Sequence, residues 1–114
     1  MHEFLEVLLP KFNQVFKNNV KITEVTVFSL QLSVKEALIM TNRQVYLLKK
    51  GFLGIKAHCF PLDEIDLKID EYKLKMTSEK HGFNTTIKIL DSRKRSLLTM
   101  ALEKFSQIKN QSQI

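Results

Sequence analysis

Two kinds of hydrophobic spacing divide the chain. Residues 3–17 carry apolar side chains at helical intervals, which predicts one amphipathic helix. Pro10 lies inside this stretch, and because proline lacks a backbone N–H we expect a break or kink there. The expected apolar stripe consists of Phe4, Leu5, Leu8, Leu9, Phe12 and Phe16.

From Val20 onward the apolar residues recur at every second position, which is typical of β-strands. The apolar runs 37–40 and 45–48 flank the polar tripeptide 41–43, so we expect a tight hairpin turn between two strands. Glycines at 51 and 54 predict the next turn, and a strand over 55–60 follows before Pro61 interrupts it. In the first run, the residues expected on the core face are Thr26, Phe28, Leu30, Leu32 and Val34.

Two further hairpins are predicted between residues 65 and 89. A two-residue turn at 70–71 would place Ile69 opposite Tyr72, and a turn at 78–82 would place Met76 opposite Phe83. In this arrangement the apolar residues of each strand lie on one face, whereas a slip of one residue would reverse them. We therefore expect an antiparallel meander.

The chain ends in a second amphipathic helix, whose start Asp91 or Ser92 would cap. Seven antiparallel strands and one amphipathic helix predict a mainly β fold with α: a partly open barrel capped by the C-terminal helix. We divide the chain into an N-terminal helical extension (1–19), the strand-rich domain (20–110) and a frayed tail (111–114). The apolar face of the last helix consists of Leu97, Leu98, Ala101, Leu102, Phe105 and Ile108.

Three motifs resemble those of a known family. The run ALIMTNRQVYLL (37–48) resembles the second and third strands of bacterial pleckstrin-homology-like (PH-like) and GRAM domains. KKGFLGIK (49–56) resembles their turn between strands three and four, and FPLDEI (60–65) resembles the junction that follows. The resemblance implies a PH-like binding domain. The N-terminal helix departs from this family pattern and would pack on the barrel, form a homo-oligomer contact or serve as an adapter.

Length and composition indicate the number of domains and the cellular compartment. The 114 residues suffice for one domain, and their 44% hydrophobic content suffices for a core without disulfides or metal. Cys59 is a single cysteine, which fits a reducing compartment, and no stretch approaches about 20 consecutive apolar residues. Glu3 and Glu6 stand where a signal peptide would carry positive charge. We expect a cytoplasmic protein, with peripheral attachment to the inner membrane face as an option.

The sequence offers little for catalysis. The three histidines, His2, His58 and His81, lack metal-site spacing, and no glycine-rich phosphate loop occurs. His58 and Cys59 are adjacent in a strand and must point to opposite faces, so they cannot act as a nucleophile and base. We expect Cys59 to point inward and His58 outward. We predict no enzymatic activity, no metal and no cofactor.

Two basic features are candidate binding sites in a chain of net charge +6. The first is the turn with Phe52 and Leu53 among lysines, which would suit shallow insertion into an anionic membrane. Alternatively, its two apolar side chains fold back as a plug. The second is a basic helix start, where arginines would contact phosphate. The candidate residues are Lys49, Lys50, Phe52, Leu53 and Lys56 in the turn, and Arg93, Lys94 and Arg95 at the helix start.

Three partner classes follow from these features. The leading hypothesis is a non-enzymatic PH-like module that recognises a protein or an anionic membrane. The second is a peripheral binder of anionic or phosphoinositide-type lipid through residues 49–56. A nucleic-acid binder is third, since it rests on charge alone and the aromatic residues follow the core pattern.

Overall fold

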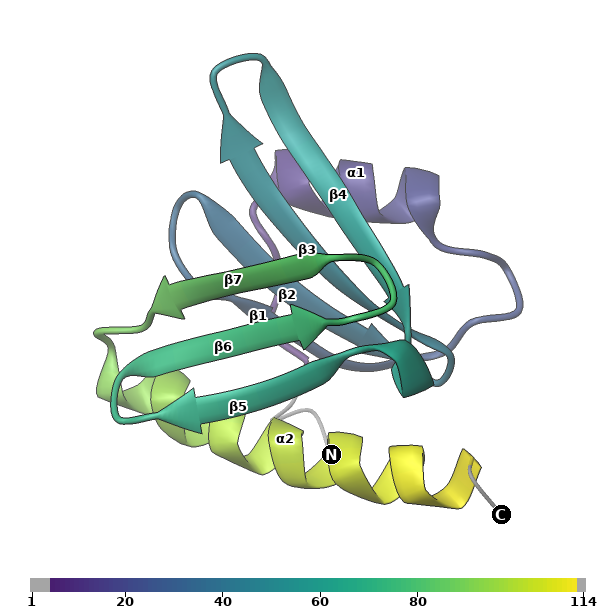
Figure 1. The fold of residues 1–114 in the computed structure, drawn as a ribbon. Coiled ribbons are helices and arrows are strands. Elements are labelled where there is room, and N and C mark those ends of the chain that lie inside the picture. Colours follow the sequence, from purple (N-terminus) through teal and green to yellow (C-terminus); the bar gives the residue numbers. More distant parts are fainter. Residues whose placement is uncertain (1–4, 113–114) are drawn as a thin grey trace. The chain divides into compact units, whose positions relative to one another are not determined.

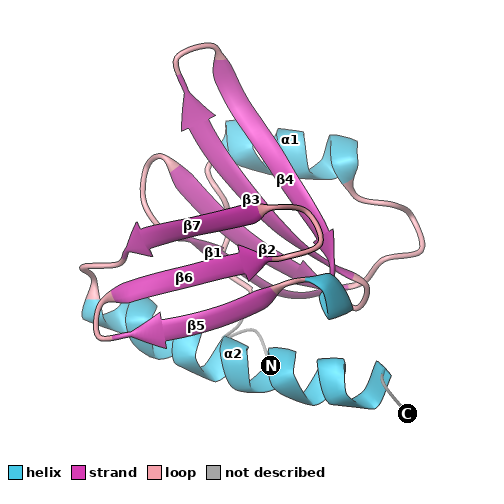
Figure 2. Cartoon of the chain, in the orientation of Figure 1, coloured by secondary structure: helices cyan, strands magenta, loops and turns pink. Residues whose placement is uncertain are grey.

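The computed structural model describes residues 5–112. It divides into two compact units, one ending at Phe60 and the other beginning at Pro61 (Figures 1 and 2). In the first unit, four antiparallel strands form one sheet in the order β1-β2-β3-β4, and a helix, α1, precedes them. The elements of this unit are α1 (Pro10–Asn19), β1 (Thr26–Gln31), β2 (Glu36–Thr41), β3 (Gln44–Gly51) and β4 (Gly54–Pro61).

The second unit contains three antiparallel strands in the order β5-β6-β7 and a long C-terminal helix, α2. A short 3-10 helix, η1, precedes its first strand, and α2 contacts both η1 and β5. Its elements are η1 (Leu62–Glu64), β5 (Asp66–Asp70), β6 (Lys73–Ser78), β7 (Phe83–Lys88) and α2 (Ser92–Ser112). The seven strands in sequence order, followed by a helix, are the order expected from the sequence.

The β2–β3 hairpin is confirmed. Met40 pairs with Val45 across the turn, and the buried Thr41 hydroxyl accepts hydrogen bonds from the backbone N–H groups of Arg43 and Gln44 at 3.1 and 3.0 Å. The strands of this hairpin are buried on both faces. On one face, the core cluster is formed by Leu8, Phe12, Phe16, Ala37, Ile39, Tyr46 and Leu48.

Helix α1 is part of this core. Phe12 is 2% exposed, and the ring of Phe16 meets the ring of Tyr46 edge to face at a centroid distance of 5.2 Å. A break was expected at Pro10, and the helix begins there, with the proline in the first turn, where its missing N–H costs nothing; the predicted helix is wrong for residues 5–9. Leu5 and Glu6 lie along β1 instead, where Glu6 donates its backbone N–H to the Ser29 carbonyl at 2.9 Å. Phe4 lies outside the described residues.

Strand β1 is shorter than predicted. It ends at Gln31, and Val34, expected in the core, is 73% exposed in the turn to β2. Gln31, expected on the polar face, is buried because its side chain accepts a hydrogen bond from the Leu9 N–H and donates to the Ser33 carbonyl. The N-terminal segment therefore covers a position that strand alternation alone would leave in solvent.

In the second unit, the predicted faces are correct but the predicted register is wrong by two residues. Ile69 pairs with Leu74 and not with Tyr72, and Met76 pairs with Thr85 and not with Phe83. A shift of two preserves the face of every side chain, because side chains alternate with a period of two. The first turn lies at residues 71–72, where Glu71 adopts a left-handed φ of 56°.

Helix α2 begins as expected. The Asp91 carboxylate accepts hydrogen bonds from the backbone N–H groups of Arg93 and Lys94 at 2.9 and 3.2 Å, so Asp91 is the N-cap. In the predicted stripe, three residues are buried and three half-buried. The helix continues through Ser112, and the last two residues of the expected tail lie outside the described range. The buried residues are Leu98, Ala101 and Phe105.

Candidate functional site

The tip of the β3–β4 hairpin carries two fully exposed apolar side chains. Phe52 and Leu53 are the two residues between the strands, and they are 103% and 96% exposed. Gly54 allows the turn through its φ of 130°, a region that side-chain-bearing residues avoid. In Figure 1 this tip lies at the top of the view. The two side chains are open to solvent and do not fold back as a plug.

Three lysines flank these apolar residues. Lys50 and Lys56 are exposed and Lys49 is half-buried. Within the described part of the chain, none of the three forms an ion pair. The lysines and the tip line one shallow depression together with His58. The five residues expected to form this site are therefore brought together on one hairpin.

The pKa of His58 reflects the positive charge of the lysines on the hairpin. Burial lowers the pKa of its imidazole, and the positive charges of Lys56 and Lys49 lower it further. An acid-free sequence from 37 to 62 contributes to this field, since no carboxylate of the hairpin neutralises the lysines. The hairpin end is thus cationic at its sides and apolar at its tip.

The turn between β1 and β2 lies at the same end of the sheet. The backbone N–H of Lys50 donates to the Lys35 carbonyl at 2.7 Å, which places the exposed Val34 and Lys35 beside the hairpin. Sequence reasoning missed these two residues because it placed Val34 in the core. The signal available was the charged pair Lys35-Glu36, which interrupts the apolar alternation.

The second candidate, Arg93, Lys94 and Arg95, belongs to the other unit. The N–H groups that would receive a phosphate at the start of α2 already bind the Asp91 carboxylate. Hydrogen bonding from the Lys94 backbone lowers the pKa of Asp91 despite an opposing effect of burial, so this internal anion stays charged. The Arg95 guanidinium donates to the carbonyls of Ile89 and Leu90 at 2.9 and 3.1 Å. The Arg95 side chain therefore supports the local structure at the helix start, whereas Arg93 and Lys94 contact Asp91 through their backbone.

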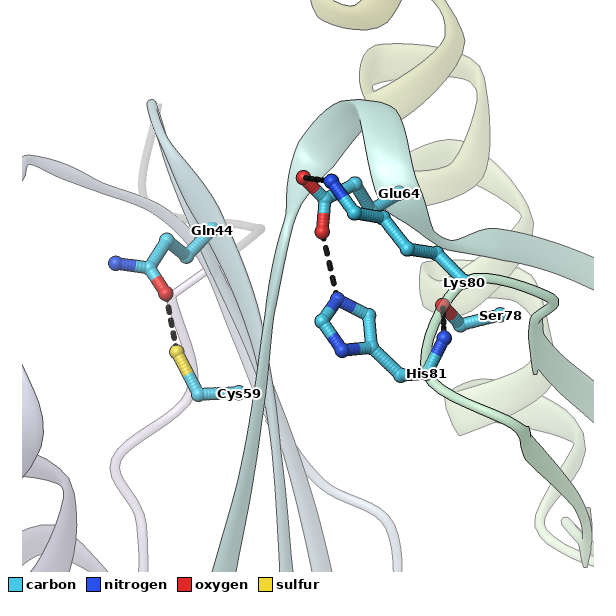
Figure 3. A network of polar contacts seen from close by, with 6 residues as sticks. All are labelled: Gln44, Cys59, Glu64, Ser78, Lys80 and His81. Atoms are coloured by element: carbon cyan, nitrogen blue, oxygen red, sulfur yellow. Dashed lines mark hydrogen bonds and ion pairs between the residues drawn. The ribbon is translucent and has the colours of Figure 1, made fainter.

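A polar cluster in the second unit ties η1 to the β6–β7 turn (Figure 3). The two oxygens of Glu64 lie 2.6 Å from the His81 imidazole and 3.2 Å from the Lys80 ammonium, and these contacts lower the pKa of Glu64. The buried Ser78 hydroxyl accepts from the backbone N–H of His81, not from its ring.

Cys59 corrects one expectation. The thiol is exposed and His58 is half-buried, so the prediction of Cys59 inward and His58 outward is wrong. Ile55 and Ala57 precede Cys59 on the same side of β4 and pack against the core cluster around α1, whereas Cys59 itself is exposed. The thiol instead hydrogen-bonds the side-chain oxygen of Gln44, as Figure 3 shows. Although the residue is exposed, neighbouring atoms shield the sulfur partly from water, and this desolvation raises the pKa of Cys59 and disfavours the thiolate.

The described residues offer neither a metal site nor a membrane-spanning helix. No three His, Cys, Asp or Glu side chains among residues 5–112 are arranged to hold a metal ion. No helix in the same range combines the length and the apolar character needed to cross a membrane.

The comparisons with known proteins identify the fold. No family model and no curated protein sequence matches this chain. Its structure is similar to a DUF1696 family protein with a pleckstrin-homology domain from Shewanella loihica PV-4, with a TM-score of 0.67 at 16% identity, covering 89% of this chain and 99% of that one. It is also similar to a pleckstrin-homology domain from Shewanella amazonensis SB2B, with a TM-score of 0.63 at 11% identity, covering 88% and 99%. The fold expected from the sequence is confirmed: this chain has the fold of bacterial pleckstrin-homology domains.

Proposed function

We propose that this protein is a non-enzymatic binding module that docks peripherally on anionic membranes through one end of its four-stranded sheet. The observation that carries the proposal is the exposure of Phe52 and Leu53 at the hairpin tip, with lysines on both sides. Two adjacent apolar side chains in full contact with water are unfavourable in a monomer, and a bilayer removes them from water. The turn with Val34 and Lys35 belongs to the same proposed surface.

The energies favour weak, reversible docking. Burying a Phe or Leu side chain contributes about 1.5–3 kcal/mol, and each lysine near an anionic surface contributes about 1 kcal/mol. Two apolar residues and three lysines thus supply about 6–9 kcal/mol. Loss of translational and rotational freedom costs about 4 kcal/mol or more. Net binding requires both the apolar burial and the attraction of the lysines to anionic lipid. Neutral vesicles and high salt, which remove or screen that attraction, should therefore each reduce binding strongly.

A membrane is favoured over a protein partner by the position of α1. A free N-terminal helix would have offered an adapter surface, but its apolar residues Phe12 and Phe16 are buried against the sheet. The exposed apolar residues at the hairpin tip, in contrast, are flanked by Lys50 on one strand and Lys56 on the other. This combination matches the layered chemistry of an anionic bilayer, with charge outside and hydrocarbon inside.

Vesicle sedimentation tests the proposal. The wild-type protein should pellet with vesicles containing acidic phosphatidylglycerol and remain in the supernatant with pure phosphatidylcholine. The Phe52→Glu/Leu53→Glu variant should lose this pelleting. Retention of wild-type protein in the supernatant with both vesicle types would refute membrane docking and direct the search to a protein partner.

A matched pair of single variants tests the position. Leu53 and Ile22 are isomers with nearly equal exposure, 96% and 101%, at opposite ends of the first unit's sheet. Leu53→Glu should weaken vesicle binding about 30-fold, the equivalent of about 2 kcal/mol of lost apolar burial. Ile22→Glu adds the same charge and should leave binding within about threefold of wild type. Equal losses in both variants would show that net charge, not the hairpin tip, controls binding.

A further inference from the structure

Building on the proposed membrane docking, we propose that the hairpin tip recognises the charge density of an anionic bilayer without selecting a headgroup. Its ligand is the surface of any fluid bilayer with sufficient negative charge, whether phosphatidylglycerol, phosphatidylserine or a phosphoinositide carries that charge. This inference rests on the kind of cation at the tip, on the shape of the depression and on the chemistry of the two exposed side chains.

The lysines at the tip are suited to attraction by the charged surface of a bilayer and not to selective binding of one phosphate group. Residues 49–56 contain three lysines and no arginine. A lysine ammonium is a compact, hydrated point charge, whereas selection of a phosphate group by shape uses the planar donor fork of arginine. Lys50 and Lys56 lie on different strands that flank the tip, and both are exposed. They can therefore each meet a different lipid of the bilayer surface.

The depression around the tip is shallow and open. It is lined by the hairpin itself, from Lys49 to Lys56, together with His58. Selective binding of a small headgroup requires an enclosed pocket that surrounds most of the ligand and aims several polar groups at it. The described residues that line the depression all belong to one hairpin, so a headgroup bound there would be covered from one side only. A free headgroup in solution would gain little from such a surface.

The apolar part of the site requires acyl chains. Phe52 and Leu53 carry no polar atom, whereas tryptophan and tyrosine at the same place would favour the headgroup level through their N–H or O–H. Both side chains extend from a two-stranded hairpin, so they can enter hydrocarbon without unfolding of the sheet. Binding should therefore need the assembled bilayer.

The test compares headgroups at equal surface charge. Wild-type protein is titrated with phosphatidylcholine vesicles in which phosphatidylglycerol, phosphatidylserine or phosphatidylinositol 4,5-bisphosphate is adjusted to the same measured zeta potential. The partition coefficients should agree within about threefold, and each should fall similarly as salt is raised. Soluble inositol trisphosphate and glycerophosphoglycerol at millimolar concentration should not displace the protein.

Charge variants complete the experiment. Lys50→Ala/Lys56→Ala should reduce binding about 30-fold for every anionic lipid, at about fivefold per lysine. Lys17→Ala/Lys21→Ala removes the same charge from exposed lysines near the other end of the sheet and should reduce binding less than about threefold. A tenfold preference for one lipid at equal zeta potential, or displacement by a soluble headgroup, overturns this inference while leaving membrane docking intact. Absence of binding to every vesicle overturns both.

Discussion

Replacement of Glu24 by glutamine tests how the loop between α1 and β1 is held. The Glu24 carboxylate accepts hydrogen bonds from the hydroxyls of Thr41 at 2.7 Å and Tyr46 at 2.7 and 2.9 Å, and from the backbone N–H of Lys21 at 2.8 Å. All its partners are donors. Glutamine would direct an NH₂ group at one of them, and Tyr46, only 1% exposed, has little access to water as a substitute.

The expected loss follows from these contacts. A hydrogen bond to a charged group contributes about 1.5–3 kcal/mol, and an unsatisfied buried donor costs about 1–3 kcal/mol. Because solvent reaches part of Glu24, we expect Glu24→Gln to lower the free energy of unfolding by about 2 kcal/mol. In a double-mutant cycle with Tyr46→Phe, the coupling energy should be at least about 1 kcal/mol. Urea unfolding followed by circular dichroism measures both values.

The effect of Glu24→Gln on the free energy of unfolding should depend on pH. Burial raises the pKa of Glu24, but hydrogen bonds from Thr41, the Lys21 backbone and Tyr46 outweigh it, so the folded pKa lies below the ordinary 4.5. A lowered pKa contributes stability that is present above the unfolded value and lost as pH falls through the folded value. The stability difference between wild type and Glu24→Gln should therefore shrink below about pH 4.5. Glu64 and Asp91, whose pKa values are also lowered, are present in both proteins and cancel. A difference that is zero at neutral pH, or independent of pH, would refute this account of Glu24.

Three further predictions concern the packing, the helix cap and the thiol. Phe12→Ala should lower the free energy of unfolding by about 3–5 kcal/mol in urea, because Phe12 is a fully buried member of the core cluster; a loss below about 1 kcal/mol would show that α1 is dispensable. Asp91→Ala should lower the melting temperature in thermal unfolding, whereas Asp91→Asn should retain most of the cap; equal losses would contradict capping. Cys59 should react with iodoacetamide in the folded protein, with a pH midpoint above that of an ordinary thiol because burial raises its pKa; labelling only after unfolding would contradict its exposure.

The strands and the helix start were predictable because their signals are local. Alternation at every second residue identifies the faces of β6, where Leu74 and Met76 are buried, whatever their partners are. Asp91 could be named as a cap because its side chain bonds only to N–H groups two and three residues away. The cationic and apolar character of the hairpin tip was also visible, since two glycines and three lysines surround Phe52 and Leu53.

Such local signals could not predict the register of the β5–β6 hairpin, the path of the chain before Pro10 or the exposure of Cys59. Alternation cannot distinguish registers that differ by two residues, and the left-handed conformation at Glu71 decided between them. The helical stripe before Pro10 was broken because Glu6 pairs with Ser29, a residue distant in sequence. Cys59 is exposed although Ile55 and Ala57, on the same side of β4, pack against the core cluster, so position in the alternation did not decide its burial.

By itself, the sequence determined which side of β5, β6 and β7 is apolar and which hairpin is basic, because successive side chains of a strand point to opposite faces whatever their neighbours are. Only the tertiary structure decided whether an apolar side chain finds a neighbour. Val34 and Phe52 stand in apolar patterns like those of buried residues, yet both remain in water because no other segment among residues 5–112 covers them.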